Sequence, residues 1–182
     1  MSYLKSLPDD NTSLLELFKA YPDTVRPLLE YHQLVMRGPS AFTPAQRELM
    51  AAYVSGLNAC GYCLGVHTVT AQQFGVPEGL LAAALKDLDA AEIEPRLKPV
   101  LRYLGKLTRT PSRMTEADAE EVYAAGWDEQ ALHGAVLVCA LFNLMNRMVD
   151  GLGVHAEESY LSLSGHRLHE GGYAGLAELL GG

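Results

Sequence analysis

Two cysteines and one histidine lie within eight residues of this chain, at Cys60, Cys63 and His67. Residues four apart share one face of a helix, so Cys63 and His67 can meet if the segment is helical. Cys60 and Cys63 are three apart. The Cβ atoms of such a pair on a regular helix are roughly 5 to 6 Å apart, whereas a disulfide requires about 3.5 to 4.5 Å. We therefore expect Cys60 at the frayed start of the helix, where Gly61 loosens the turn and the pair can open and close.

This placement favours a thiolate, the form of cysteine that acts as a nucleophile. The partial positive charge at a helix N-terminus and a basic imidazole one turn away can together lower a cysteine pKa from about 8.5 into the neutral range. Cys60, Cys63 and His67 therefore form a candidate redox-active dithiol with its own base.

Alternative roles for the two cysteines are weaker but stay open. The thiols could be small buried side chains, or could bind zinc, although the cluster offers at most three ligands and no second pair with finger spacing follows. A c-type haem needs a histidine directly after the second cysteine, and Leu64 stands there. A thioredoxin-like site would follow a strand, and none is expected before Cys60. We expect neither a metal nor a cofactor.

Together with an upstream carboxylate, these residues resemble a known motif. Glu48, then eleven residues, Cys60-x-x-Cys63, then three residues and His67 is similar to the E-x11-C-x2-C-x3-H signature of the alkylhydroperoxidase D-like proteins, within the carboxymuconolactone decarboxylase-like superfamily. The resemblance covers residues 41 to about 85 at the level of the motif.

The segment FNLMNRMVDGLGV, at 142 to 154, is similar to one found in the peroxidase-related group of that superfamily. The resemblance implies a thiol-dependent peroxidase in which Cys63 attacks a hydroperoxide and Cys60 resolves the resulting sulfenic acid as a disulfide. His67 and Glu48 would relay protons. It also implies a thiol reductant or reductase of unknown identity, and dimers that build trimers or hexamers.

Two points qualify the site. Glu48 lies on the preceding helix, so it reaches His67 only if the two helices pack antiparallel across the SGLNA turn; otherwise it is a solvated glutamate. The best-known members of the family place a second histidine between the cysteines, where this chain has Tyr62. That residue removes a candidate proton donor.

Composition limits the partners of the protein. The 182 residues suit one domain, and the net charge of -8, with no run of Lys and Arg, opposes nucleic acid. The start of the chain lacks an apolar signal region, and the longest strictly apolar run, AVLVCALF at 135 to 142, is far shorter than the roughly 20 residues of a membrane span. We expect a cytoplasmic protein that binds no membrane. Three cysteines in a reducing compartment are then not a structural disulfide framework.

The fold class predicted from the spacing of apolar residues and from helix start and stop signals is all-α. We expect a single domain over 1–182, a compact helical bundle of the alkylhydroperoxidase D-like type. Its N-terminal helical arm covers 1–40, the redox core 41–152, and a short helix near 155–163 with a loosely held glycine-rich tail 153–182. The remaining helices are predicted after Ser13, over 25–37, after Thr43, over 60–74, from Pro77, over 95–107, over 116–125, and over 128–150, the last being the central and most buried helix.

Two further features of the 128–150 helix carry predictions. Cys139 lies in an apolar run and is expected to be a buried small side chain. Asn143, Asn146, Arg147 and Asp150 form one polar strip, which needs partners on another helix, on a subunit or in the thiol pocket.

Two different functions remain as alternatives to the peroxidase. A carboxymuconolactone decarboxylase-like enzyme would act on a γ-lactone acid, chemistry that has no need of a dithiol. A non-catalytic, redox-responsive assembly protein would use the dithiol to change helix packing.

Overall fold

Helices make up all the regular secondary structure that this computed structural model describes, in residues 2–7 and 13–180. The prediction of an all-α fold is therefore confirmed. Along the chain the helices are α1 (Leu14–Ala20), α2 (Pro22–Arg37), α3 (Pro44–Leu57), α4 (Gly61–Gln73), α5 (Leu80–Lys86), α6 (Leu97–Arg109), the 3-10 turn η1 (Pro111–Arg113), α7 (Glu116–Ala124), α8 (Glu129–Gly151) and α9 (Glu158–Glu178).

Side-chain caps fix where several helices begin. Ser13, Thr43 and Thr115 each form a capping box with the residue three positions later, and Asp128 accepts a hydrogen bond from the backbone N–H of Ala131. Each cap satisfies N–H groups that the first turn of a helix leaves without a partner. The predicted starts of α1, α3, α7 and α8 are confirmed.

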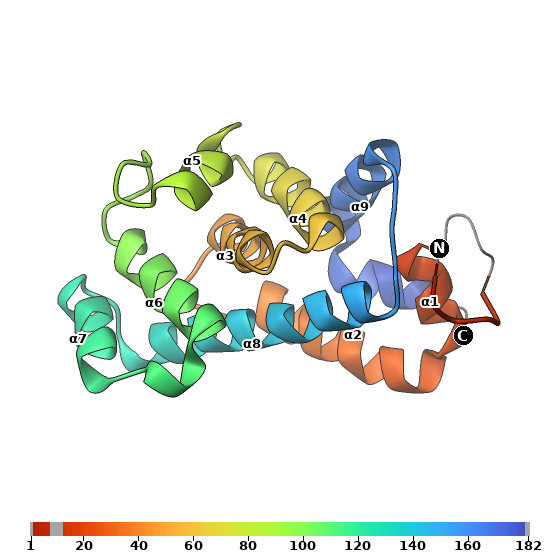
Figure 1. Cartoon of the computed structure of the whole chain (residues 1–182), viewed down its shortest axis with the longest axis horizontal. Coiled ribbons are helices and arrows are strands. Elements are labelled where there is room, and N and C mark those ends of the chain that lie inside the picture. Colours follow the sequence, from red (N-terminus) through yellow and green to blue (C-terminus); the bar gives the residue numbers. More distant parts are fainter. Residues whose placement is uncertain (1, 8–12, 181–182) are drawn as a thin grey trace.

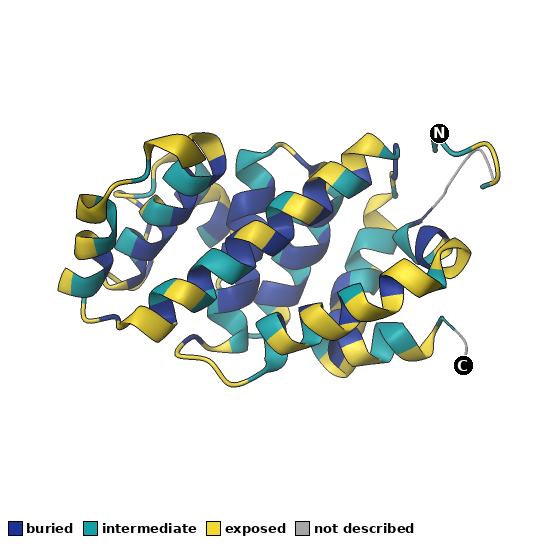
Figure 2. Ribbon diagram, turned by 90° about the horizontal axis from the view of Figure 1, so that it is seen from below, coloured by how far each residue is buried: buried dark blue, intermediate teal, exposed yellow. Residues whose placement is uncertain are grey.

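α3 occupies the centre of the bundle, with α4, α5, α6 and α8 packed around it (Figure 1). Nine successive residues of α3, 47 to 55, are buried. The prediction that α8 is the most buried helix is wrong, because neighbours cover only one side of α8 and Leu144 on its outer side is 48% exposed. Buried residues gather in the middle of the molecule, while exposed ones follow the outer helices (Figure 2).

By length and composition alone, α8 could cross a membrane, and it is the one helix of the described residues that could. Core helices of bundles meet the same criterion. In this fold α8 packs against α2, α3, α4, α6 and α7.

The C-terminal segment differs from its prediction. In place of a short helix and a loose tail, α9 runs from Glu158 to Glu178 and packs on α4 and α2. Gly165 permits this contact, because a Cβ atom there would lie 2.6 Å from the Cβ of Val69. Gly165 thus serves close packing, which composition alone does not distinguish from flexibility.

α5 also begins later than predicted, at Leu80 and not near Pro77. Gly79 adopts a left-handed conformation, with φ of 78°, so the chain turns there before the helix starts.

The N-terminal arm, α1 and α2, packs on the rest of the bundle through α2, which contacts α9 and α8. Arg47 fixes the end of α2, because its Nη1 atom donates to the carbonyl oxygens of Val35 and Gly38, both at 2.9 Å. These carbonyls belong to the last turn, where a helix leaves acceptors without partners. The contact holds Arg37, the last residue of α2, beside α3.

Candidate active site

The dithiol lies at the start of α4, as predicted. Cys60 is the N-cap residue with extended backbone angles (φ −80°, ψ 93°), and Cys63 follows in the first turn. Both are buried, and neither forms a disulfide. Ala59, just before the pair, has a φ of 56°, a conformation that is costly for a residue with a side chain. A strained backbone residue therefore sets the direction from which Cys60 approaches Cys63.

A hydrogen bond joins the two thiols. The hydrogen bond from the Cys63 side chain, together with the Cys63 backbone N–H, lowers the pKa of Cys60 below its ordinary value, although burial opposes the shift. The same hydrogen bond, then burial, raises the pKa of Cys63 well above its ordinary value. Removal of a second proton would place two negative charges side by side, so one thiolate forms readily and two do not.

Two residues of the polar strip on α8 face this pair. The amide of Asn146 donates to Ser55 Oγ (3.0 Å) and accepts from Asn58 Nδ2 (2.8 Å), and its contact with Cys63 favours the thiolate there. The carboxylate of Asp150 lies beside Cys60 and disfavours a negative charge on that sulfur. The thiol pocket is thus one of the partners predicted for the strip.

The remaining two residues of the strip bond within α8 and to α6. Asn143 donates to the carbonyl of Cys139 (3.0 Å) and to Thr108 (3.4 Å), and Arg147 donates back to Asn143. Cys139 itself is buried, as predicted, and burial raises its pKa.

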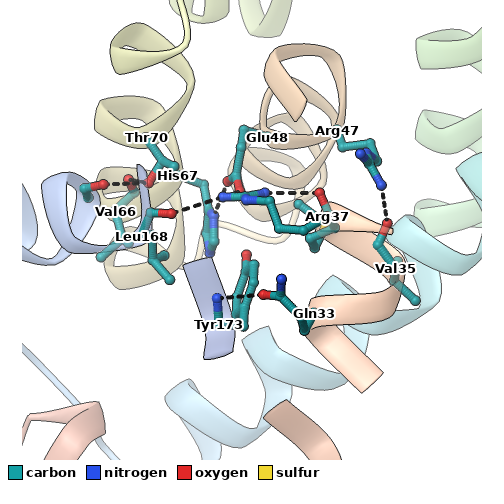
Figure 3. A network of polar contacts seen from close by, with 12 residues as sticks. Gln33, Val35, Arg37, Arg47, Glu48, Val66, His67, Thr70, Leu168 and Tyr173 are labelled. Carbon is teal, nitrogen blue, oxygen red and sulfur yellow. Dashed lines mark hydrogen bonds and ion pairs between the residues drawn. The ribbon is translucent and has the colours of Figure 1, made fainter. Parts of the chain in front are cut away.

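Glu48 and His67 meet across the α3–α4 hairpin (Figure 3). The antiparallel packing that their contact requires is therefore present. The Oε2 atom of Glu48 lies 2.6 Å from Nδ1 of His67, and Oε1 lies 2.7 Å from Nη2 of Arg37. Burial alone would raise the pKa of Glu48, but the charges and hydrogen bonds of His67 and Arg37 outweigh it and lower the pKa below its ordinary value. The carboxylate is therefore ionised and accepts a hydrogen bond from Nδ1–H, which leaves Nε2 of His67 for proton exchange.

Arg37 was not predicted to belong to the site. Its guanidinium also donates to the carbonyl of Leu168 on α9 (3.2 Å) and lies over the rings of Phe74 and Tyr173. An arginine in the last turn before a glycine is typical of any helix C-terminus, so no local signal distinguishes this one. Its contact with Glu48 exists only because α2 packs beside α3.

Cys63 and His67 face a common cavity of about 60 Å³ between α1, α2, α4, α8 and α9. A water molecule needs about 10 to 15 Å³ in this measure, so the cavity has room for a few waters or for a small ligand. Cys60 does not line it. Apart from Cys63, the lining is Leu14, Leu15, Phe18, Leu29, His32, Tyr62, Val66, His67, Phe142, Met145, Tyr160, Ser164, Arg167, Leu168, Tyr173 and Leu176.

A second histidine in the cavity wall, His32, was also not predicted to belong to the site. Its Nδ1–H donates to the carbonyl of Leu28 at 2.7 Å, and burial lowers its pKa to about 4. His32 is therefore neutral at physiological pH. Tyr62, which stands between the two cysteines in sequence, packs beside Tyr160 with ring centroids 6.5 Å apart, and burial raises its pKa.

Within residues 2–7 and 13–180, no three His, Cys, Asp or Glu side chains are arranged to hold a metal ion. The cluster can instead exchange protons and electrons through its own thiols and imidazole.

Comparison with known proteins agrees with this fold. Residues 22–106, which include Arg37 and the whole Glu48 to His67 motif, match the carboxymuconolactone decarboxylase family. The match therefore covers the predicted motif and a little less than half of the chain. YdfG, an uncharacterized protein of Bacillus subtilis (strain 168), is 25% identical over 117 residues, which are 64% of this chain and 80% of that protein.

Solved structures show that the fold of the chain is alkylhydroperoxidase D-like. An uncharacterized peroxidase-related protein from Silicibacter sp. TM1040 superposes with a TM-score of 0.76 at 23% identity, over 81% of this chain and 78% of that one. The alkylhydroperoxidase AhpD core of an uncharacterized peroxidase-related protein from Ralstonia eutropha JMP134 gives 0.75 at 22% identity, over 82% and 78%. The family predicted from the motif is confirmed.

Proposed function

We propose that this protein is a thiol-dependent peroxidase, in which Cys63 reduces a hydroperoxide and Cys60 closes a disulfide with it. One observation carries the proposal. Cys63 faces a largely apolar cavity while it contacts a second thiol and stands one helical turn from the His67–Glu48 pair. A nucleophile, a base, a residue that orients the base and a resolving thiol are the parts that such a reaction needs.

The first half of the reaction takes place in the cavity. Nε2 of His67 accepts the proton of Cys63, and the thiolate attacks the terminal oxygen of the hydroperoxide. An S–O bond forms, the O–O bond breaks, and its electron pair goes to the alkoxide oxygen, which takes the proton back from His67. The products are an alcohol and the sulfenic acid of Cys63.

The second half closes the disulfide. Cys60 attacks the sulfur of the Cys63 sulfenic acid as a thiolate. The S–S bond forms and the S–OH bond breaks, and the departing hydroxide combines with the proton of Cys60 to give water. Two thiols of an external reductant, oxidised to a disulfide, then return the dithiol to its reduced form.

The electrostatics and the cavity point to different sulfurs as the nucleophile. The lowered pKa belongs to Cys60, but Cys60 does not line the cavity. A proton between two hydrogen-bonded sulfurs can move to either one. Asn146 favours the charge on Cys63, whereas Asp150 disfavours a negative charge on either sulfur. Access of the peroxide therefore selects Cys63.

Single-turnover measurements on the reduced protein test this assignment. Cumene hydroperoxide should be consumed with the loss of two titratable thiols per molecule, whereas Cys63→Ser should consume none. Cys60→Ser should consume one equivalent and stop at a sulfenic acid that dimedone traps. Cys139→Ser, a cysteine buried outside the site, is the matched control and should react like the wild type.

Several results would favour a different nucleophile or a different function. Full turnover in Cys63→Ser would assign the attack to another group. Conversion of a γ-lactone acid after alkylation of both cysteines would favour the decarboxylase, and a change of oligomer size on oxidation without peroxide consumption would favour an assembly protein. The homo-oligomer and the cytoplasmic location remain predictions, and light scattering checks the first.

A further inference from the structure

α9 contains a break just before its last turns. Gly172 has φ of 60° and ψ of −159°, which is not helical, and the chain resumes as a helix at Tyr173. Gln33 of α2 caps the resumed segment, because its Oε1 atom accepts from the backbone N–H groups of Tyr173 (3.0 Å) and Ala174 (3.1 Å). A Cβ atom at Gly172 would lie 2.9 Å from that same oxygen. The break and the cap together fix where the side chain of Tyr173 points.

That side chain enters the site. The ring of Tyr173 is 3% exposed, lies 5.0 Å from the ring of His32, and has the guanidinium of Arg37 over it at 5.3 Å. Its phenol oxygen points to the Arg37–Glu48–His67 cluster (Figure 3). Tyr173 also lines the cavity that Cys63 and His67 face.

The phenol oxygen makes no well-aligned hydrogen bond among the residues that the structure describes, although the carboxylate of Glu48 lies close enough to interact with its O–H. A buried hydroxyl without a well-aligned partner is destabilising, because water no longer solvates it. Fixing such a group with a backbone break and a side-chain cap is hard to explain by packing alone, since phenylalanine would fill the same space.

We propose that Tyr173 is a catalytic hydrogen-bond donor, whose O–H binds the hydroperoxide oxygen that departs as the alcohol. The proposal rests on the peroxidase function proposed above. In the attack by Cys63, negative charge develops on this oxygen as the O–O bond breaks, and a donor already in place stabilises it.

Tyr173 keeps its proton throughout the reaction. Burial, and then the negative charge of Glu48, raise the pKa of the phenol well above its ordinary value, so it remains a neutral donor. The proton that the alkoxide takes comes from His67. A phenol that is held protonated can donate a hydrogen bond without competing with His67 for the proton.

The test is Tyr173→Phe, measured with two kinds of peroxide. With tert-butyl hydroperoxide the leaving oxygen is a poorly stabilised alkoxide, and kcat/KM should fall by about 100-fold, the lower end of the loss for one such donor. With a peroxybenzoic acid the leaving group is a carboxylate that spreads its own charge, and the loss should be several-fold at most. Oxidation of the dithiol by a disulfide, which releases no alkoxide, should be unchanged. Tyr103→Phe, a phenol on α6, is the matched control and should match the wild type with every oxidant.

Stability gives a second readout. Because the variant removes a buried hydroxyl that makes no well-aligned hydrogen bond, its Tm should equal or exceed that of the wild type. A Tm lowered by several degrees, or an equal loss with both peroxides, would overturn the role of Tyr173 while leaving the peroxidase in place. A wild-type protein that consumes neither peroxide overturns the peroxidase, and the role of Tyr173 with it.

Discussion

Protonation of His32 should destabilise the protein, and the size of the effect follows from its burial. The imidazole is enclosed between Tyr173 and Phe142, with ring centroids 5.0 and 6.3 Å away, and burial lowers its pKa from 6.5 to about 4. Between these two values the unfolded chain binds one more proton at this residue than the folded protein does. The free energy of unfolding therefore falls as the pH is lowered through this range.

The full difference between the two pKa values corresponds to about 3 kcal/mol, at about 1.4 kcal/mol per pKa unit. About 2 kcal/mol of this should be lost between pH 7 and pH 5. Carboxylates elsewhere also change the stability with pH, so the measurement compares two proteins and not one protein with itself.

Urea unfolding of the reduced wild type and of His32→Asn, from pH 7 to pH 5, makes that comparison. Asparagine can still donate to the carbonyl of Leu28 but does not titrate. The variant should start less stable, and the gap between the proteins should narrow by about 2 kcal/mol as the pH falls. His133→Asn, at an exposed histidine, should run parallel to the wild type. A constant gap between wild type and His32→Asn would falsify the assignment of a buried, neutral imidazole at this position.

Two substitutions test the packing and the charges of the site. Gly165→Ala should lower stability by about 1 to 3 kcal/mol, because the new Cβ would lie 2.6 Å from the Cβ of Val69, whereas Gly175→Ala on the same helix meets nothing within 4 Å and should be neutral or stabilising. Glu48→Gln should cost about 3 to 5 kcal/mol in urea unfolding, because it leaves the charge of Arg37 unpaired. Adding Arg37→Leu should recover part of that loss, and additive losses would contradict the ion pair.

Local signals in the sequence predicted the positions of most helices. A capping residue such as Thr43 determines a helix start through hydrogen bonds to residues three positions away, so the information lies within one turn. The same holds for Cys60, which the spacing to Cys63 and the neighbouring glycine place at a helix N-terminus. These predictions needed no knowledge of the rest of the fold.

Predictions that depend on contacts between distant helices were less accurate. Gly165 and Gly172 suggested a loose tail, but the first lies against Val69 on α4 and the second against Gln33 on α2. Glycine allows both flexibility and close approach, and only the neighbour decides which applies. The burial of α3 relative to α8 depends in the same way on how closely the surrounding helices pack against each.

The candidate site likewise combines residues that are close in sequence with one that comes from a distant helix. The α3–α4 hairpin holds Glu48, Cys60, Cys63 and His67 within about twenty residues of sequence, and a short turn brings them together. Arg37 comes from α2, whose position beside α3 no local pattern encodes.

Arg37 nevertheless affects the protonation of Glu48 and His67 on the hairpin. Burial in the centre of α3 opposes a charge on Glu48, and a protonated carboxyl would no longer require a proton on Nδ1 of His67. Together with His67, the guanidinium of Arg37 keeps the carboxylate ionised, and the ionised carboxylate holds the proton on Nδ1. In the proposed reaction, Nε2 then stays available as the base for Cys63. The reactivity of the thiol pair therefore depends on how α2 packs beside the hairpin as well as on the motif itself.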